Sequence, residues 1–437
     1  MNNAELLENL FLYKNDEKKV AYIYDLNSSK KYLLPYSKTQ KLSNEDILLM
    51  NSLSELPIEQ EVNRLEHLRL ILTNKCNLNC IYCYANGGTY NEKLADMSYE
   101  TIVNSINYFY SSYEYIHQIS FFGGEPLLKI DLINQTCEYV VGFCKQNHIK
   151  LPIFSMVTNG VLIDDKAIEI IDKFKIQTNL SLDGPKDFND RQRIFSDKDR
   201  SVFEIVDYNA KKLRKKIKFS VESTCTNIIN EYGYSFDDIQ NFFRKRYLID
   251  RVNVAAAMIV NDVDSDLELK GEKEEEKSLY KIVNRFFRKD HSKYAFNDII
   301  IRLLNTYFSN YYCASFCDAG LKQYTIAMNG DIYPCQLFFS SKENKLGNIN
   351  NLINKEMHLF QRKYKKEFDK CKKCGYRRFC QTCLCKVDEI ERSDNYCLEV
   401  KKGVDLFIQN MLSLKENNRK EYGILLKEYK EFYENIL

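Results

Sequence analysis

Short apolar runs alternate with amphipathic stretches from residue 67 to about residue 260. The runs suit β-strands, and the stretches between them repeat their apolar residues at helical spacing. Six such units predict a mainly parallel sheet covered by helices, either doubly wound or closed toward a barrel. The predicted strands are His67–Thr73, Gln118–Phe122, Pro152–Thr158, Ile176–Leu182, Ile217–Ser223 and Arg251–Ile259, and the predicted helices are Tyr99–Tyr110, Leu132–Gln146, Ala167–Phe174, Phe203–Leu213 and Phe236–Arg244.

The N-terminal region, residues 1–65, has a different pattern. Val20–Asp25 and Lys31–Tyr36 flank a short polar turn and predict a β-hairpin. Ser43 and the acidic residues after it predict the start of a helix over Ile47–Leu53. A hairpin with a free strand edge would suit a small peptide-binding module. A structural lid on the sheet fits the same pattern, and the sequence leaves both interpretations open.

Composition narrows the class of protein. The chain has 437 residues, a formal net charge of +2 and 15 cysteines. The near-neutral charge gives no reason to expect a nucleic acid as partner. No apolar run is long enough to span a membrane, and the N-terminus lacks the pattern of a signal peptide, so a cytoplasmic location is expected. In such a chain, many cysteines favour metal or cluster binding over disulfides.

Residues 73–84 contain Cys76, Cys80 and Cys83 at C-x3-C-x2-C spacing, directly after the first predicted strand. Three thiolates can hold three irons of a [4Fe–4S] cluster and leave the fourth iron open to a substrate, whereas electron-transfer clusters usually take four cysteines. A zinc knuckle is the alternative, but zinc sites are usually closed by a nearby fourth ligand. The next possible ligand is Cys137, far along the chain.

This cysteine spacing, with Tyr82 just before the last cysteine, resembles the signature of the radical S-adenosylmethionine (radical SAM) superfamily. The resemblance implies an α/β fold, a partial (β/α)6 TIM-type barrel, with its site at the C-terminal ends of the strands. It also implies that Cys76, Cys80 and Cys83 are catalytic and hold a [4Fe–4S] cluster. The cluster would bind S-adenosyl-L-methionine (SAM) and generate a 5′-deoxyadenosyl radical that takes hydrogen from the substrate.

Other motifs suggest SAM contacts by the same resemblance. Gly123, Gly124, Glu125 and Pro126 are similar to the GGEP motif, whose backbone accepts a hydrogen bond from the SAM ammonium group. Ser181, at the end of the fourth predicted strand, and Arg193 are candidates for the ribose and carboxylate of SAM. Tyr82 could pack near the adenine. A surface role for Arg193 and core packing for Tyr82 are the alternatives.

The C-terminal third contains a second group of cysteines that resembles the SPASM extension of radical SAM enzymes. This extension holds two auxiliary [4Fe–4S] clusters, which makes three clusters in all. The resemblance assigns Cys371, Cys374, Cys380 and Cys397 to auxiliary cluster II, and Cys313, Cys317, Cys335 and either Cys383 or Cys385 to auxiliary cluster I. Leu384 occupies the position where the pattern has its cysteine, so the last ligand stays open. A pair of zinc ribbons is the alternative.

The resemblance predicts four regions: an N-terminal module (1–65) that would bind a leader peptide, a radical SAM barrel (66–290), a SPASM domain (291–400) and a C-terminal helical segment (401–437). It also predicts an oxidoreductase that matures a ribosomally made, cysteine-rich precursor peptide by forming a thioether crosslink. Carbon–carbon crosslinking or another peptide oxidation is the alternative. Flavodoxin or ferredoxin would supply the low-potential electron.

Sulfatase maturation, which makes formylglycine, is a further alternative. Sulfatase-maturing enzymes have an aspartate as general base directly after the cysteine that corresponds to Cys335. This chain has Gln336 there, and an amide cannot take a proton at neutral pH. A catalytically silent, zinc-stabilised binding protein is the interpretation from a different class.

Overall fold

The computed structural model divides the chain into two compact units, which are described separately. One unit comprises Val62–Glu274 and Asp318–Lys363, and the other comprises Met1–Glu61, Glu275–Cys317 and Tyr364–Leu437. The structure describes residues 4–7, 10–15, 20–26, 30–35, 64–197, 199–257, 266–270, 278–288, 296–308, 318–339, 341–350, 374–376, 378–380 and 394–434.

The first unit is built on a nine-stranded sheet with strand order β10-β9-β8-β7-β6-β5-β11-β12-β13. Six parallel strands make up most of it: β5 (Arg64–Thr73), β6 (Tyr115–Gly123), β7 (Ile153–Thr158), β8 (Gln177–Ser181), β9 (Phe219–Cys225) and β10 (Val252–Ala256). They lie side by side in chain order, each next to the strand that follows it in the sequence. In a doubly wound sheet the order changes direction partway across the sheet, which does not happen here. The predicted partial (β/α)6 arrangement is therefore confirmed.

Three short strands extend this sheet beyond β5. They are β11 (Gln323–Ile326), β12 (Asp331–Tyr333) and β13 (Gly347–Asn348). β11 is parallel to β5, while β12 is antiparallel to β11 and β13 is antiparallel to β12. This extension brings Cys335, which follows β12, to the same sheet as the three-cysteine loop that follows β5.

All five predicted helices are present, as α3 (Tyr99–Ser112), α4 (Ile130–Asn147), α5 (Asp165–Phe174), α7 (Val202–Arg214) and α9 (Phe236–Tyr247). Polar side chains cap several of them. At the start of four helices, a side-chain oxygen accepts a hydrogen bond from a backbone N–H of the first turn; these residues are Ser98, Asp164, Ser201 and Ser235. Two shorter helices were not predicted, α6 (Lys186–Gln192) and α8 (Ile229–Tyr232), because neither is long enough to show a helical apolar period.

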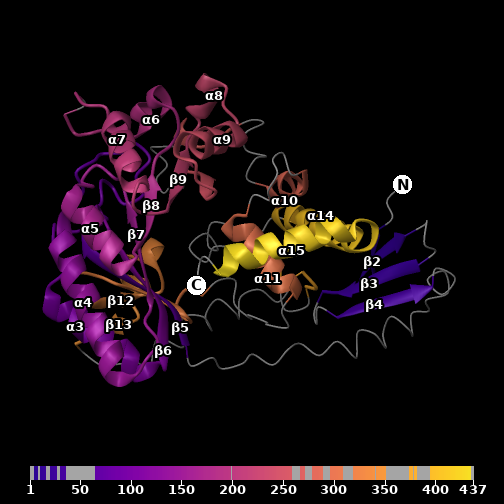
Figure 1. The fold of residues 1–437 in the computed structure, drawn as a ribbon, viewed down its shortest axis with the longest axis horizontal. Coiled ribbons are helices and arrows are strands. Elements are labelled where there is room, and N and C mark those ends of the chain that lie inside the picture. The colour runs from indigo at the N-terminus through magenta and orange to yellow at the C-terminus, as the bar shows by residue number, and fades with distance from the viewer. Residues whose placement is uncertain are drawn as a thin grey trace. The chain divides into compact units, whose positions relative to one another are not determined.

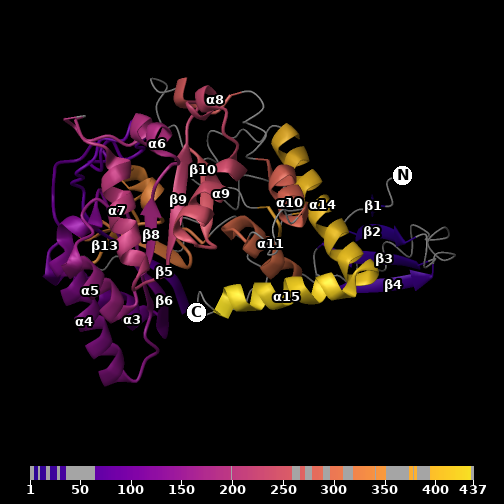
Figure 2. The same cartoon turned by 45° about the horizontal axis from the view of Figure 1, so that its top comes forward.

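The two faces of the parallel sheet differ in polarity. Along β7, β8 and β9, fully buried residues alternate with partly exposed ones. The buried face packs against helices, as in the stack of Phe121 on Phe154 and the contact of Phe154 with Phe174 of α5. Figures 1 and 2 show α3, α4, α5 and α7 along this face. The opposite face is polar and partly accessible.

The described residues of the second unit form a four-stranded antiparallel sheet and four helices. The strands are β1 (Ala4–Leu7), β2 (Leu10–Asn15), β3 (Val20–Asp25) and β4 (Lys31–Pro35). The predicted hairpin is confirmed as β3–β4, whereas β1 and β2 were not predicted. The predicted helix over Ile47–Leu53 lies outside the described residues.

The described helices of this unit are α10 (Leu279–Arg288), α11 (Asp298–Phe308), α14 (Asp394–Asn417) and α15 (Arg419–Glu434). Figure 2 shows the bend between α14 and α15. Tyr24 of β3 stacks on Tyr307 of α11 with ring centroids 5.0 Å apart, within one core that also includes Phe407 of α14. Among the described residues, no helix combines the length and hydrophobicity that a membrane crossing needs.

Candidate cluster and cofactor site

The three-cysteine loop begins where β5 ends, at the carboxyl edge of the parallel sheet. Backbone hydrogen bonds join it to the end of α6 and the residues that follow: Ile81 N–H donates to Gln192 O (3.0 Å) and Asn79 N–H donates to Ile194 O (2.7 Å). Cys76, Cys80 and Cys83 are free thiols and partly exposed. The loop therefore presents its three thiols from a backbone that is fixed on both sides.

Burial dominates the chemistry of these thiols. It raises the pKa of Cys76 to about 12 and also raises the pKa of Cys80. Without a cation these groups would stay protonated, whereas a bound metal deprotonates its thiol ligands. Among the described residues, no three His, Cys, Asp or Glu side chains converge on a single metal ion. A cubane cluster instead takes one thiolate at each of several irons, so well-separated thiols suit it.

The GGEP turn, residues 123–126, packs backbone against backbone on the start of the loop. Gly124 N–H donates to Thr73 O (2.8 Å), and Glu125 N–H donates to Lys75 O (2.9 Å). A Cβ on Gly123 would lie 2.1 Å from Thr73 O, and one on Gly124 would lie 2.2 Å from Lys75 O. Only glycine permits this approach, so the turn leaves its backbone beside the cysteine loop.

The Glu125 carboxylate is fully enclosed and is used within the protein. It accepts hydrogen bonds from Thr158 Oγ1 (2.6 Å), Asn159 N–H (2.8 Å) and Leu127 N–H (3.0 Å). Burial raises its pKa, and these three donors oppose that shift. The side chain thus ties the GGEP turn to the end of β7. Asn159 Nδ2 in turn donates to Asn77 Oδ1 of the cysteine loop (2.8 Å).

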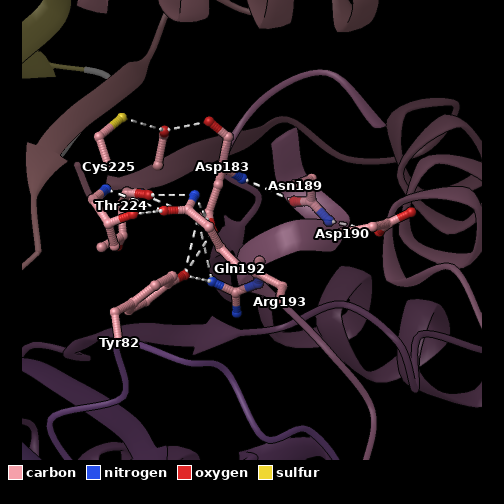
Figure 3. A network of polar contacts seen from close by, with 10 residues as sticks. Tyr82, Asp183, Asn189, Asp190, Gln192, Arg193, Thr224 and Cys225 are labelled. Carbon is pink, nitrogen blue, oxygen red and sulfur yellow. Dashed lines mark hydrogen bonds and ion pairs between the residues drawn. The ribbon is translucent and has the colours of Figure 1, made fainter. Parts of the chain in front are cut away.

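A buried polar network joins Tyr82 of the cysteine loop to Asp183 and Arg193 (Figure 3). Arg193 Nη1 donates to the Tyr82 hydroxyl (2.6 Å) and lies 3.5 Å from Asp183 Oδ1. The Tyr82 hydroxyl donates to Asp183 Oδ2 (2.8 Å), and Thr224 N–H donates to Asp183 Oδ1 (3.1 Å). Arg193 is only 7% exposed, so the surface role considered for it is wrong.

Arg193 retains one unused donor. Its Nε is buried without a hydrogen-bond partner among the described residues, and Cys80 and Cys76 are among the electrostatic neighbours of the guanidinium. A planar guanidinium donor beside the cluster loop suits a carboxylate. Together with three thiols and the glycine backbone, this arrangement fits a cluster with SAM. Ser181, the last residue of β8, is opposite Glu222 of β9 in the sheet.

Asp183 was not predicted as a site residue, although it lies directly after the fourth predicted strand. Its partner Tyr82 is 101 positions away and Thr224 is 41 positions away, so periodicity could not pair them. The only available signal was its place at the carboxyl end of a strand, where polar residues of this fold often have a function.

Replacement of Asp183 by asparagine is expected to destabilise the protein by about 3 to 5 kcal/mol, because it removes the carboxylate that is paired with the buried guanidinium of Arg193. Denaturant titration followed by circular dichroism measures this change. Asp172→Asn is the matched control, since its ion pair with Lys175 is exposed and little change is expected. Equal stability of the two variants would show that the buried pair has no structural role.

The described residues include part of the C-terminal cysteine group. Cys335 lies in the unit with the parallel sheet, and Cys374, Cys380 and Cys397 lie in the other unit. The Tyr376 hydroxyl, between the first two of these, donates to Asp405 Oδ1 of α14 (2.7 Å), the helix that also contains Cys397. The remaining predicted ligands, Cys313, Cys317, Cys371, Cys383 and Cys385, lie outside the described residues.

Three other cysteines confirm the interpretation as small core residues. Cys137, Cys144 and Cys225 are all buried, at 0%, 3% and 0% exposure. Burial raises the pKa of each of these thiols. They therefore pack as apolar side chains within the first unit.

Family models match two parts of the chain. The model of the radical SAM superfamily covers residues 70–245, and that of the SPASM iron–sulfur cluster-binding domain covers residues 317–383. The fold and the cysteine site thus define an enzyme of the SAM-dependent radical class. The chain belongs to the radical SAM superfamily and contains a SPASM domain.

Several relatives extend over most of the chain. A cysteine-type anaerobic sulfatase-maturating enzyme of Clostridium perfringens (strain 13 / Type A) is 24% identical over 370 residues, which cover 78% of this chain and 96% of that enzyme. The solved structure of native anSMEcpe with bound AdoMet and Kp18Cys peptide has a TM-score of 0.65 at 21% identity, covering 81% of this chain and 99% of the other. Streptococcus suis SuiB bound to precursor peptide SuiA has a TM-score of 0.52 at 17% identity, covering 90% and 98%.

Proposed function

We propose that this radical SAM enzyme matures a ribosomally made, cysteine-rich precursor peptide by forming an intramolecular thioether crosslink. The observation that carries this choice is at Gln336. Its amide oxygen accepts a hydrogen bond from Arg69, at the position where sulfatase-maturing enzymes have an aspartate base. A neutral amide next to a guanidinium cannot accept a proton. The sulfur of the substrate must therefore lose its proton by other means than this side chain.

The polar face of the sheet supports a peptide as substrate. His67 Nε2 and Ser120 Oγ share a hydrogen bond (2.6 Å), and Ser120 in turn bonds to Ser155. Two amides, Asn179 Nδ2 (3.1 Å) and Asn253 Nδ2 (2.8 Å), donate to the carboxylate of Glu222. Barrels of this type usually fill their interior with bulky aliphatic side chains. A face rich in donors and acceptors is instead suited to a chain of amides.

Solved relatives of the same fold have been obtained with peptides, namely anSMEcpe with a Kp18Cys peptide and SuiB with its precursor SuiA. This supports a peptide as the class of substrate. The polar face lies on the same sheet as the cysteine loop, whose strand β5 contributes His67. A peptide on that face would lie against the sheet whose carboxyl edge holds the three cysteines.

In this proposal, Cys76, Cys80 and Cys83 hold the cluster that supplies the 5′-deoxyadenosyl radical once SAM is bound. The backbone of residues 123–126 takes the ammonium group of SAM, the free Nε of Arg193 takes its carboxylate, and Ser181 contacts its ribose. Asp183 and Tyr82 orient Arg193.

The SPASM cysteines hold two auxiliary clusters. Cluster I is held by Cys313, Cys317, Cys335 and either Cys383 or Cys385, and cluster II is held by Cys371, Cys374, Cys380 and Cys397. A flavodoxin or ferredoxin supplies the electron.

Sulfatase maturation is the second candidate, and the comparisons support it equally. The Clostridium perfringens relative that matches 78% of this chain is a cysteine-type sulfatase-maturating enzyme. That activity would require another group to replace the aspartate base. Glu222 is a carboxylate on the polar face, and its bonds to Asn179 and Asn253 hold it in place. It is the residue to test under this alternative.

Two peptides distinguish the candidates in an anaerobic assay with reductant and SAM. The protein is expected to leave a cysteine-containing sulfatase peptide without formylglycine, while an anaerobic sulfatase-maturating enzyme converts it as a positive control. A cysteine-rich peptide encoded beside the gene should lose two hydrogens and one free thiol for each link. Formylglycine in the first peptide, lost in Glu222→Gln, would instead establish sulfatase maturation.

A further inference from the structure

Two buried hydrogen-bond donors without partners lie on neighbouring strands of the sheet. Among the described residues, the buried side-chain atoms without a hydrogen-bond partner include Arg69 Nε and Thr325 Oγ1. Thr325 of β11 is directly opposite Arg69 of β5 in the sheet. The hydroxyl of Tyr90, an electrostatic neighbour of Arg69, is hydrogen-bonded to Tyr84 and is not a free donor. An orphaned buried polar group is costly, so two at facing positions need an explanation.

The charge of Arg69 is also uncompensated by the described residues. Its Nη1 donates only to the neutral amide oxygen of Gln336, and its guanidinium lies 5.3 Å from the centre of the Phe122 ring. The groups that favour its charged form are Cys335, Tyr84 and Tyr90, with no carboxylate among them. A partly buried guanidinium is normally paired with an anion. The surroundings of Arg69 thus lack one negative charge.

The two unused groups share one chemical property, because Arg69 Nε and the Thr325 hydroxyl can both donate a hydrogen bond. Thr325 is 0% exposed, so water does not satisfy its hydroxyl easily. The nearby ring of Tyr90 packs edge-on against Phe339, with the ring centroids 4.6 Å apart. Two donors and one cation suit an anion. Cys335, an electrostatic neighbour of Arg69 directly before Gln336, is able to carry one.

We propose that Arg69 and Thr325 form a donor set for the anionic sulfur of an iron–sulfur cluster held by Cys335. This inference rests on the ligand role proposed above for Cys335. Hydrogen bonds and positive charge near the sulfurs of a cluster stabilise its reduced form and raise its reduction potential. The donor set would therefore make this cluster a better electron acceptor than it would be in a neutral, apolar site.

The test is a redox titration of the full-length, anaerobically reconstituted protein, followed by electron paramagnetic resonance. Cys335→Ala identifies the signal of the cluster in question. Arg69→Met is expected to shift the midpoint potential of that signal to more negative values. Thr325→Val should shift it less in the same direction, with iron content unchanged. Arg64→Met is the matched control on the same strand, since Arg64 already bonds Glu66 and Tyr115.

An unchanged potential in Thr325→Val, together with an unchanged or unfolded Arg69→Met protein, would overturn the inference. A Cys335→Ala protein that keeps every cluster signal would overturn it as well, because Cys335 would then not be a cluster ligand. Neither result depends on the peptide assays, so failure of the donor set can be told apart from failure of the proposed peptide chemistry.

Discussion

A variant with alanine at Cys76, Cys80 and Cys83 is expected to produce no 5′-deoxyadenosine from SAM under reducing conditions. These three thiols are the only ligands that the loop after β5 offers, and an iron–sulfur cluster cannot assemble there without them. The same variant should keep the iron bound through the C-terminal cysteines. If three cubane clusters are present, iron content should fall from about twelve to about eight atoms per chain. Product analysis and iron determination measure the two effects.

Cys137→Ala with Cys225→Ala is the matched control, because it removes buried thiols that pack in the core. It should retain SAM cleavage and the full iron content. Persistent 5′-deoxyadenosine formation in the triple variant would contradict the assignment of the catalytic cluster. Loss of all iron would show instead that the C-terminal clusters depend on the barrel site.

Gly124→Ala is expected to reduce the rate of SAM cleavage about 100-fold or more, because misplacing reacting groups by about 1 Å can cost that much. The new Cβ would lie 2.2 Å from Lys75 O and 3.0 Å from Cys76 N, both backbone atoms that cannot rotate away. The GGEP turn and the cysteine loop would have to separate. Cleavage of SAM by the reconstituted variant, at saturating SAM, measures this effect.

Gly142→Ala is the control for the loss of glycine itself. Gly142 lies inside α4, and a Cβ there would meet no atom within 4 Å. Alanine at a helix interior stabilises by about 0.5 to 1 kcal/mol relative to glycine, so this variant should keep full activity. Similar activity in the two variants would mean that the close approach at Gly124 has no catalytic role.

The sequence predicted the parallel sheet well because its strands and helices have strong and regular apolar periods. It could not decide between a doubly wound sheet and a barrel until the resemblance was considered, since both have the same period. The helix α6 was missed because only seven residues form it. β1 and β2 were missed because residues 1–15 lack a turn signal as clear as that before Lys31.

Local motifs identified the cysteine loop and the GGEP turn, but not the contacts that support them. Arg193 was a candidate with a surface alternative, and its burial against Tyr82 and Asp183 depends on three segments meeting in space. The orphaned donors at Arg69 and Thr325 had no sequence signal at all. They are neighbours because β11 pairs with β5, strands that are more than 240 positions apart.

The measurement that tests the central claim most directly is the intact mass of a small cysteine-rich peptide, encoded beside the gene and co-expressed anaerobically with the protein. Its alkylatable thiols are counted at the same time. The proposed function predicts a loss of two hydrogens and one thiol for each link. Mass loss with every thiol still free would contradict thioether formation and favour a carbon–carbon link or another oxidation.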